Sequence, residues 1–211
     1  MGQRKPRGRK HTIEIGSKGV AIHDLTLPDA KPEIEWVVAK GWAGAVESKD
    51  PSVFDVSTLK KLPEANHDCS IQTRTGNLKY LQLVEFTGDT NFHGDYESVE
   101  KHHNGGERLS QILSLINKKA KRYGDTKDVV LLIYITDFRF NFMPIVSVLG
   151  TLFKSKPPPF ERIYQVSVTP DGSAGISVIH PFHGTPLSES QIRLRLGGKV
   201  YTPGPEDRIN K

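Results

Sequence analysis

An aspartate and a glutamine in one short segment of the chain have the chemistry to share a divalent metal ion. Asp68 opens a first apolar stretch, Gln82 stands inside a second one, and the pair Gly76-Asn77 separates them. Two such stretches around a Gly-Asn pair predict a β-hairpin. An acid on one strand and an amide on its partner can hold a metal ion between them, because oxygen atoms are the ligands that Mg²⁺ prefers.

Side chains alternate between the two faces of a strand, so Gln82 shares its face with Val84. At these positions the chain resembles the PD-(D/E)XK nuclease superfamily. The superfamily pattern is an Asp, a hairpin connection, then Glu, Asp or Gln, one spacer, and a Lys that helps to position the attacking water. Asp68 matches the first position, Gln82 the Gln form of the second, and Val84 stands where the pattern has Lys. The resemblance implies that Asp68 and Gln82 are catalytic residues that bind Mg²⁺.

The order of the expected elements extends this resemblance over roughly residues 32–182. A continuous apolar run at 129–135 indicates a strand that is covered on both faces. The resemblance implies an α/β fold with a mixed central sheet flanked by helices, that is, a restriction-endonuclease-like core. After the first hairpin, the expected elements are a helix at 107–123, a strand at 129–135, a helix at 142–153 and a hairpin of strands at 162–168 and 174–180.

The expected helix at 107–123 carries cations in its last turns, namely Lys118, Lys119, Lys121 and Arg122. Some members of the superfamily take the positive group of the site from a neighbouring helix. The resemblance therefore implies that Lys118 or Lys121 replaces the lysine that is absent at Val84. The alternative is structural, because cations stabilise the negative C-terminal end of a helix.

A helix is also expected at 31–46, where Pro32 and the acids of the first turn suit a helix start. The first helix of the superfamily often contributes an acid to the site. Glu33, Glu35 and Glu47 are candidates for this role by their element alone. The alternative for each is an exposed position on the solvated face of the helix.

Three further stretches have weaker patterns. Alternating residues predict short strands at 12–15 and 20–23, and the charged, turn-rich sequence of 49–63 predicts a loop or a short helical turn. Alternation around a Gly-Gly pair predicts an edge hairpin of strands at 192–196 and 199–202.

A long loop is expected at 88–106, because this stretch has no clear periodicity. Its acids and histidines could together bind a metal, although their spacing fits no specific ligand pattern. The alternative is that they are simply exposed. The residues concerned are Asp89, His93, Asp95, His102 and His103.

The excess of positive charge lies at the start of the chain. The first ten residues contain five bases and no acid, and the remainder has as many bases as acids. This pattern predicts a flexible basic tail at 1–10, followed by a single domain at 11–211. Such a tail can pair with the phosphates of DNA or RNA; the alternative is a solvated terminus without function. The predicted nucleic-acid-binding residues are Arg4, Lys5, Arg7, Arg9 and Lys10.

Composition excludes several classes of protein. No apolar run reaches the roughly 18 residues of a membrane span, and the charged start of the chain lacks the apolar stretch of a secretory signal. We therefore expect a cytoplasmic protein without membrane contact. The single cysteine, Cys69, cannot form an internal disulfide, and is either a packing residue or a nucleophile. Motifs of nucleotide-binding loops and serine hydrolases are absent from the sequence.

On the sequence alone, we expect a nucleic-acid-associated protein whose nuclease activity is weak or lost. A neutral Gln82 is a poorer Mg²⁺ ligand than a carboxylate, and Val84 removes a cation. One alternative is an active Mg²⁺-dependent nuclease that takes its lysine from the following helix. Another is a non-catalytic protein-interaction domain. The hairpin predicts that the side chains of Asp68 and Gln82 approach one another at one edge of the sheet.

Overall fold

A computed structural model describes most of the chain between residues 11 and 197. The described residues are 11–16, 19–24, 27–28, 30–63, 67–87, 104–123, 126–136, 140, 142–169 and 172–197, with the backbone alone described in 11–24. The predicted basic tail, residues 88–103 of the predicted loop, and the predicted strand at 199–202 lie outside these ranges.

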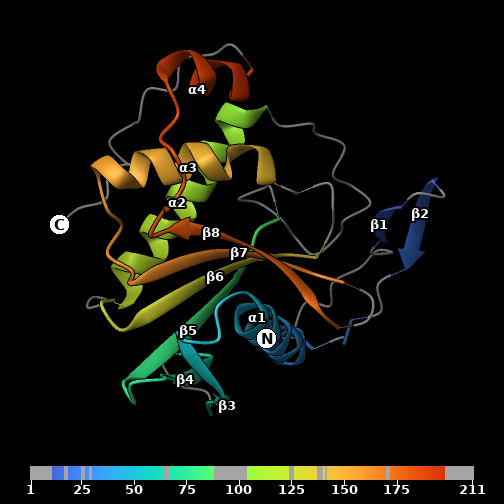
Figure 1. Ribbon diagram of the computed structural model, residues 1–211, viewed down its shortest axis with the longest axis vertical. Coiled ribbons are helices and arrows are strands. Elements are labelled where there is room, and N and C mark those ends of the chain that lie inside the picture. The colour runs from blue at the N-terminus through green and yellow to red at the C-terminus, as the bar shows by residue number, and fades with distance from the viewer. Residues whose placement is uncertain are drawn as a thin grey trace, which may run out of the picture.

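Six strands form one mixed sheet in the order β3-β4-β5-β6-β7-β8 (Figure 1). Strands β5, β6 and β7 are parallel, and the other neighbours are antiparallel. The α/β fold with a mixed sheet flanked by helices is thus confirmed. The strands are β3 (Phe54–Lys61), β4 (Cys69–Thr73), β5 (Leu78–Glu85), β6 (Val129–Ile135), β7 (Arg162–Val168) and β8 (Ala174–His180).

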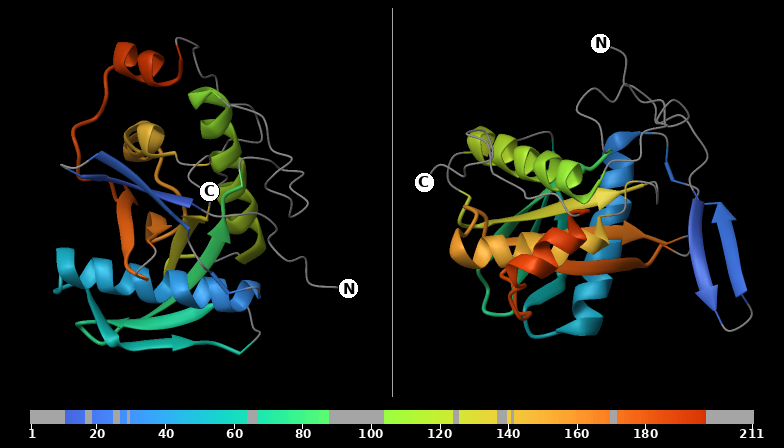
Figure 2. Two further views of the ribbon diagram at one scale, coloured as in Figure 1. Left: turned by 90° about the vertical axis from the view of Figure 1, so that its right-hand side faces the viewer. Right: turned by 90° about the horizontal axis from the view of Figure 1, so that it is seen from above.

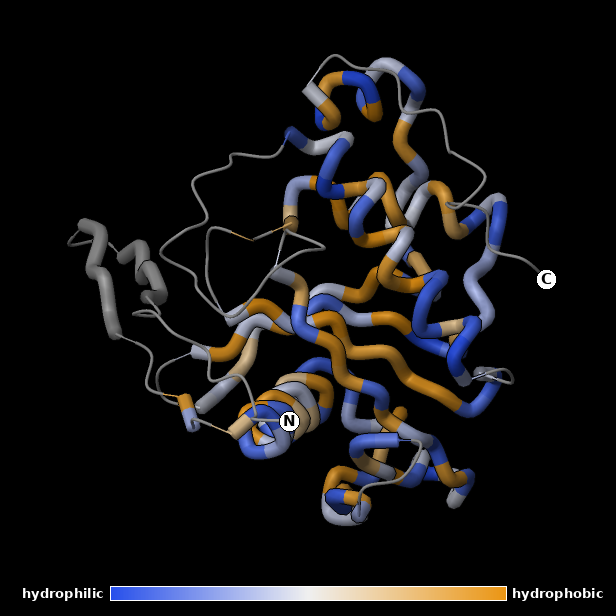
Figure 3. Tube along the Cα trace, turned by 180° about the vertical axis from the view of Figure 1, so that it is seen from behind, coloured by the Kyte–Doolittle hydropathy of each residue, from blue (hydrophilic) through white to orange (hydrophobic). Residues whose placement is uncertain are grey.

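Helices cover both faces of this sheet (Figure 2). One face of β6, with Val130 and Leu132, packs against α1; the other, with Leu131 and Ile133, packs against α2 and α3. Figure 3 shows the apolar central strands between these layers. The helices are α1 (Lys31–Lys49), α2 (Gly105–Tyr123), α3 (Met143–Ser155) and α4 (Glu189–Arg195). None of the described helices combines the length and the apolarity needed to cross a membrane.

The two strands at the start of the chain form a separate hairpin. Strands β1 (His11–Gly16) and β2 (Gly19–Asp24) pair with each other and not with the six-stranded sheet. Figure 2 shows this hairpin standing to one side of the larger sheet. The prediction of two short strands in this stretch is confirmed.

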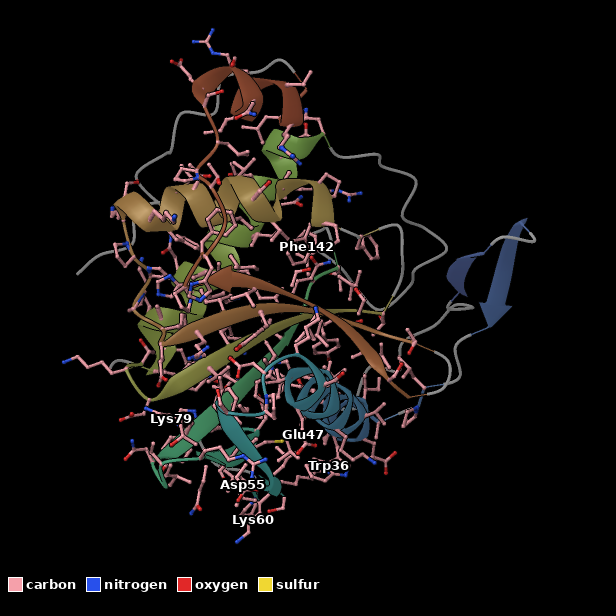
Figure 4. All side chains as sticks on the ribbon, viewed as in Figure 1. Trp36, Glu47, Asp55, Lys60, Lys79 and Phe142 are labelled. Atoms are coloured by element: carbon pink, nitrogen blue, oxygen red, sulfur yellow. The ribbon has the colours of Figure 1, made fainter. Side chains whose placement is uncertain are left out.

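Helix α1 packs tightly against the sheet through Trp42, which is fully buried. The indole makes edge-on contacts with the rings of Phe54, at 5.3 Å between centroids, and Tyr164, at 5.5 Å. Gly41 permits this approach, because a Cβ there would lie 3.1 Å from the carbonyl oxygen of Gly172. Figure 4 shows Glu47 on this side of the sheet and Phe142 on the other.

Helix α2 begins at a capping box. The backbone N–H of Glu107 donates to Oδ1 of Asn104 at 2.9 Å, and the N–H of Asn104 donates to Oε2 of Glu107 at 3.0 Å. Leu109, Ile112 and Ile116 of this helix are buried against the sheet. Their spacing places Lys119, which follows Ile116 by three residues, on the same side of the helix.

Two sequence predictions are wrong. The predicted loop at 49–63 contains strand β3, an irregular edge strand that pairs with β4 although much of its length is polar. The predicted strand at 192–196 belongs to helix α4 and the turn after it. A capping box between Ser188 and Gln191 starts this helix. The alternation of apolar and basic residues at 192–195 therefore occurs in a helix and not in a strand.

Candidate functional site

Asp68 and Gln82 meet where β4 begins beside β5. The backbone N–H of Asp68 donates to the carbonyl oxygen of Leu81 at 3.2 Å. The side-chain Nε2 of Gln82 donates to Oδ2 of Asp68 at 2.5 Å, and the N–H of Leu83 donates to the same oxygen at 2.7 Å. The predicted approach of the two side chains is confirmed. Both neighbours of β5 are strands, however, so the pair lies inside the sheet and not at its edge.

The amide of Gln82 is buried and only partly satisfied. Its nitrogen faces Asp68 and also lies within hydrogen-bonding distance, 3.3 Å, of the Leu83 carbonyl oxygen. Its oxygen, Oε1, is buried and has no hydrogen-bond partner among the described residues. A buried acceptor without a partner costs about 1–3 kcal/mol. This oxygen is therefore available to a ligand, and it could share a cation with Asp68 only if the amide turned and gave up its hydrogen bond to that residue.

Helix α1 brings a second carboxylate to the site. Glu35 is only 7% exposed, and its charge interacts with that of Asp68. Nζ of Lys31 forms an ion pair with Oε1 of Glu35 at 3.4 Å. Burial raises the pKa of Glu35 to about 7; the charge of Lys31 opposes this rise and that of Asp68 adds to it. Glu35 can therefore gain or lose a proton near neutral pH.

The other two candidate acids of α1 lie away from this pair. Glu33 and Glu47 are exposed, and Glu47 faces Arg74 at 3.5 Å. The alternative of a solvated position holds for these two residues and not for Glu35. Helical periodicity could have predicted the burial of Glu35, because this residue stands three positions before the buried Val38 and seven before the buried Trp42.

Among the lysines of α2 in the described chain, Lys119 is the one whose charge interacts with Asp68 and Glu35. Lys118 and Lys121 are exposed, whereas Lys119 is half-buried. Burial lowers the pKa of Lys119, and the charges of Asp68 and Glu35 oppose this shift. Lys119 follows the buried Ile116 by three residues, so the helical period could have identified it. Val84 packs against the α2 side of the core.

His67 and Cys69 flank Asp68 and form the walls of the site. The ring of His67 stacks on Tyr80, at 4.6 Å between centroids, and on Tyr123, at 5.3 Å. Burial lowers the pKa of His67, which favours the neutral ring. Burial raises the pKa of the Cys69 thiol to about 12, and the charge of Asp68 adds to this rise. A thiol with such a pKa is a packing group and not a nucleophile.

Residues of this site line two cavities. One of about 510 Å³ is lined by Glu35, Asp68 and His67, with Trp36 and Lys61 at its walls. The other, of about 340 Å³, lies between the end of β5 and helix α2, and Lys119 lines it. Because Lys119 also interacts with Asp68, the two cavities lie close to the same pair of opposite charges.

The oxygen ligands available here are two carboxylates and an amide. Hard oxygen donors of this kind suit Mg²⁺ or Mn²⁺ better than zinc, and the unpaired Oε1 of Gln82 could join them if the amide turned toward the ion. Within the described ranges, no three residues among His, Cys, Asp and Glu gather closely enough to hold a metal by themselves. The histidines and acids suggested at 89–103 and the basic residues of the tail lie outside those ranges.

Comparisons of the chain with family models, with curated proteins and with solved structures found no match in any of the three.

Proposed function

We propose that this protein is a divalent-metal-dependent phosphodiesterase that acts on nucleic acid, with a restriction-endonuclease-like core and a site of the PD-(D/E)XK kind. One observation carries the proposal. Asp68 contacts Gln82 at 2.5 Å and lines one cavity together with Glu35. Val84 stands where the superfamily pattern has its lysine, and Lys119 lines the same cavity as Val84 and interacts with the charge of Asp68. Two buried or half-buried acids, an amide oxygen and a cation in one place are the components that such a reaction needs.

The carboxylates of Asp68 and Glu35 and the Oε1 atom of Gln82 would hold the metal. A bound Mg²⁺ supplies a Lewis acid for the phosphate and lowers the pKa of a coordinated water. The Leu83 N–H fixes the orientation of the Asp68 carboxylate. Lys119 offers a positive charge, in a partly dehydrated place, to the negative charge that develops on the phosphate.

The protonation of Glu35 makes metal binding depend on pH. A protonated carboxyl is a poor metal ligand, and the pKa of Glu35 lies at about 7. Affinity for Mg²⁺ should therefore rise as the pH rises through neutrality. A neutral amide is also a weaker ligand than a carboxylate. Together these effects favour a low affinity for Mg²⁺ and a modest rate of cleavage.

A second candidate function is binding of nucleic acid without cleavage. The hydrogen bond from Gln82 to Asp68 favours it, because this bond stabilises the carboxylate without any metal. If neither the basic tail nor Lys119 binds phosphate, the remaining candidate is a protein-interaction domain with no polyanion partner.

Cleavage assays separate these candidates. Single- and double-stranded DNA and RNA are incubated in Mg²⁺ and in Mn²⁺ with the wild-type chain, with Asp68→Ala, with Lys119→Ala and with the control Lys121→Ala. Metal-dependent cleavage that both site variants abolish and the control retains supports the enzyme. Cleavage that survives Asp68→Ala places the activity elsewhere and refutes the proposed site. Binding without any cleavage supports the second candidate.

A further inference from the structure

The smaller cavity, between helix α2 and the end of β5, has the charge of an anion-binding pocket. Three cations of α2 line it, against a single acid, Glu85, which already accepts a hydrogen bond from the hydroxyl of Thr136. Lys118 and Arg122 stand four residues apart, so they project from the same face of the helix. Among the described residues, no carboxylate pairs with either of them.

This pocket is joined to the proposed site by one residue. Lys119 lines the pocket and its charge also interacts with Asp68. An anion held by Lys118 and Arg122 would therefore lie beside the place where Asp68 would hold a metal. In a nucleic-acid strand, the phosphate next to the scissile one has this relationship to the reacting centre.

The remaining walls of the pocket suit a sugar or base better than a free phosphate ion. Val84, Phe86 and Leu115 give it an apolar side. Gln111 lines it as well, and the Oε1 atom of this residue is buried without a partner among the described residues. A phosphodiester has no hydrogen to donate, whereas a sugar hydroxyl or a base amino group has one. A ligand that carries both a phosphate and such a donor satisfies the cations and the amide together, and on the substrate of the proposed function this ligand is a nucleotide.

We infer that this pocket, lined by Gln111, Lys118, Lys119 and Arg122, binds the nucleotide next to the scissile phosphate of a nucleic-acid strand. The inference rests on the proposed function. It adds that the substrate strand runs along helix α2. Lys118 and Arg122 hold the phosphate, the apolar wall contacts the sugar and base, and Gln111 accepts a hydrogen bond from one of them.

The test is the affinity of the full chain for short fluorescent single-stranded DNA and RNA in EDTA, where no cleavage occurs. The variant Lys118→Ala with Arg122→Ala is compared with Lys60→Ala with Lys121→Ala, which removes the same charge from exposed positions outside the pocket. The pocket variant should bind roughly tenfold more weakly. The dependence of log affinity on log salt should flatten by about 0.7, since the two residues hold one phosphate and each single-strand phosphate contact contributes about 0.7. Equal losses in the two double variants would overturn the inference.

A second variant tests whether the ligand is a nucleotide. Gln111→Leu should weaken binding of the oligonucleotides about fivefold, as expected for one hydrogen bond, and should leave binding of inorganic polyphosphate unchanged. Equal weakening for both ligands, or for neither, would refute the role of Gln111 and with it the assignment of a nucleotide. Circular dichroism verifies that each variant is folded.

The pocket inference and the proposed function can be refuted separately. The affinity measurements in EDTA require neither a metal nor cleavage. Loss of cleavage in every assay, with intact pocket binding, would refute the enzyme alone. Cleavage that continues in the pocket variant at saturating substrate, with unchanged affinity, would refute the pocket alone.

Discussion

The side-chain nitrogen of Gln82 donates a hydrogen bond of 2.5 Å to the carboxylate of Asp68. The bond fixes the amide with its nitrogen toward Asp68 and leaves its oxygen buried and unpaired among the described residues. A metal shared by the two side chains binds oxygen atoms, so the amide has to give up this hydrogen bond to become a ligand. That exchange opposes metal binding, and it leads to the first prediction.

Gln82→Glu should increase the affinity for Mg²⁺, because a carboxylate is a stronger ligand than an amide. Without metal, the same change should destabilise the fold by about 1–3 kcal/mol, since it replaces a donor beside Asp68 by a second acid. Isothermal titration calorimetry and thermal unfolding with and without Mg²⁺ measure the two effects. Gln82→Leu is the control, which should lose the hydrogen bond without gaining a ligand. An unchanged affinity in Gln82→Glu would contradict a metal ligand at this position.

Glu35 should make the stability of the metal-free protein decrease as the pH rises. Its pKa in the folded protein is about 7, above the ordinary value of 4.5. The folded state therefore holds a proton that the unfolded chain has already lost between these two pH values, and stability falls as the pH rises through this window. The total loss is on the order of 3 kcal/mol.

Urea unfolding between about pH 5 and pH 8 tests this dependence. Glu35→Gln should be nearly independent of pH in this window, and Glu33→Gln, an exposed control on the same helix, should behave as the wild type. A wild-type dependence in Glu35→Gln would show that another group is responsible.

Lys119→Ala should lower kcat for cleavage by roughly 100-fold, the effect of removing one group that stabilises charge in a transition state. Single-turnover kinetics at saturating substrate and Mg²⁺ measure this change apart from binding. Lys121→Ala, an exposed lysine on the same helix, should keep the wild-type kcat. A similar loss in both variants would indicate that the total charge of α2, and not Lys119, determines the rate.

Trp42→Ala should destabilise the fold by about 3–5 kcal/mol, because it removes a fully buried ring that contacts Phe54 and Tyr164. Trp36→Ala should cost no more than about 1 kcal/mol, since that indole is only partly buried. Denaturant unfolding followed by far-ultraviolet circular dichroism compares the two variants. Equal costs would mean that the packing of α1 does not depend on Trp42.

Removal of the first ten residues should weaken binding of DNA and RNA and flatten its salt dependence by roughly 2–4, because five cations are lost. Fluorescence anisotropy at several salt concentrations measures both quantities. An unchanged salt slope would show that the tail makes no phosphate contacts.

The parts of the structure that could be predicted are those that depend on neighbours in the sequence. The hairpin with Asp68 and Gln82 follows from a Gly-Asn turn and two apolar stretches, and the core of α2 follows from its period. Strand β3 could not be predicted, since a polar edge strand is held by its backbone pairing with β4. Glu35 and Lys119 join the site only because α1 and α2 pack on the sheet. The spacing of each residue from buried neighbours indicates which side of its helix it lies on. It does not indicate that Glu35 and Lys119 both lie near Asp68.

The position of Lys119 on a helix, and not on strand β5, affects how mutations can change its distance from the carboxylates. A lysine at position 84 of β5 would lie at a fixed distance from Gln82, because β5 has a fixed hydrogen-bond register with β4 and β6. Lys119 has no such constraint, because its position depends on how Ile112 and Ile116 seat α2 on the core. Swapping these isoleucines for valine or leucine can shift the helix by a fraction of a residue. The distance between Lys119 and the carboxylates of Asp68 and Glu35 can thus change in small steps through mutations in the core, outside the proposed site.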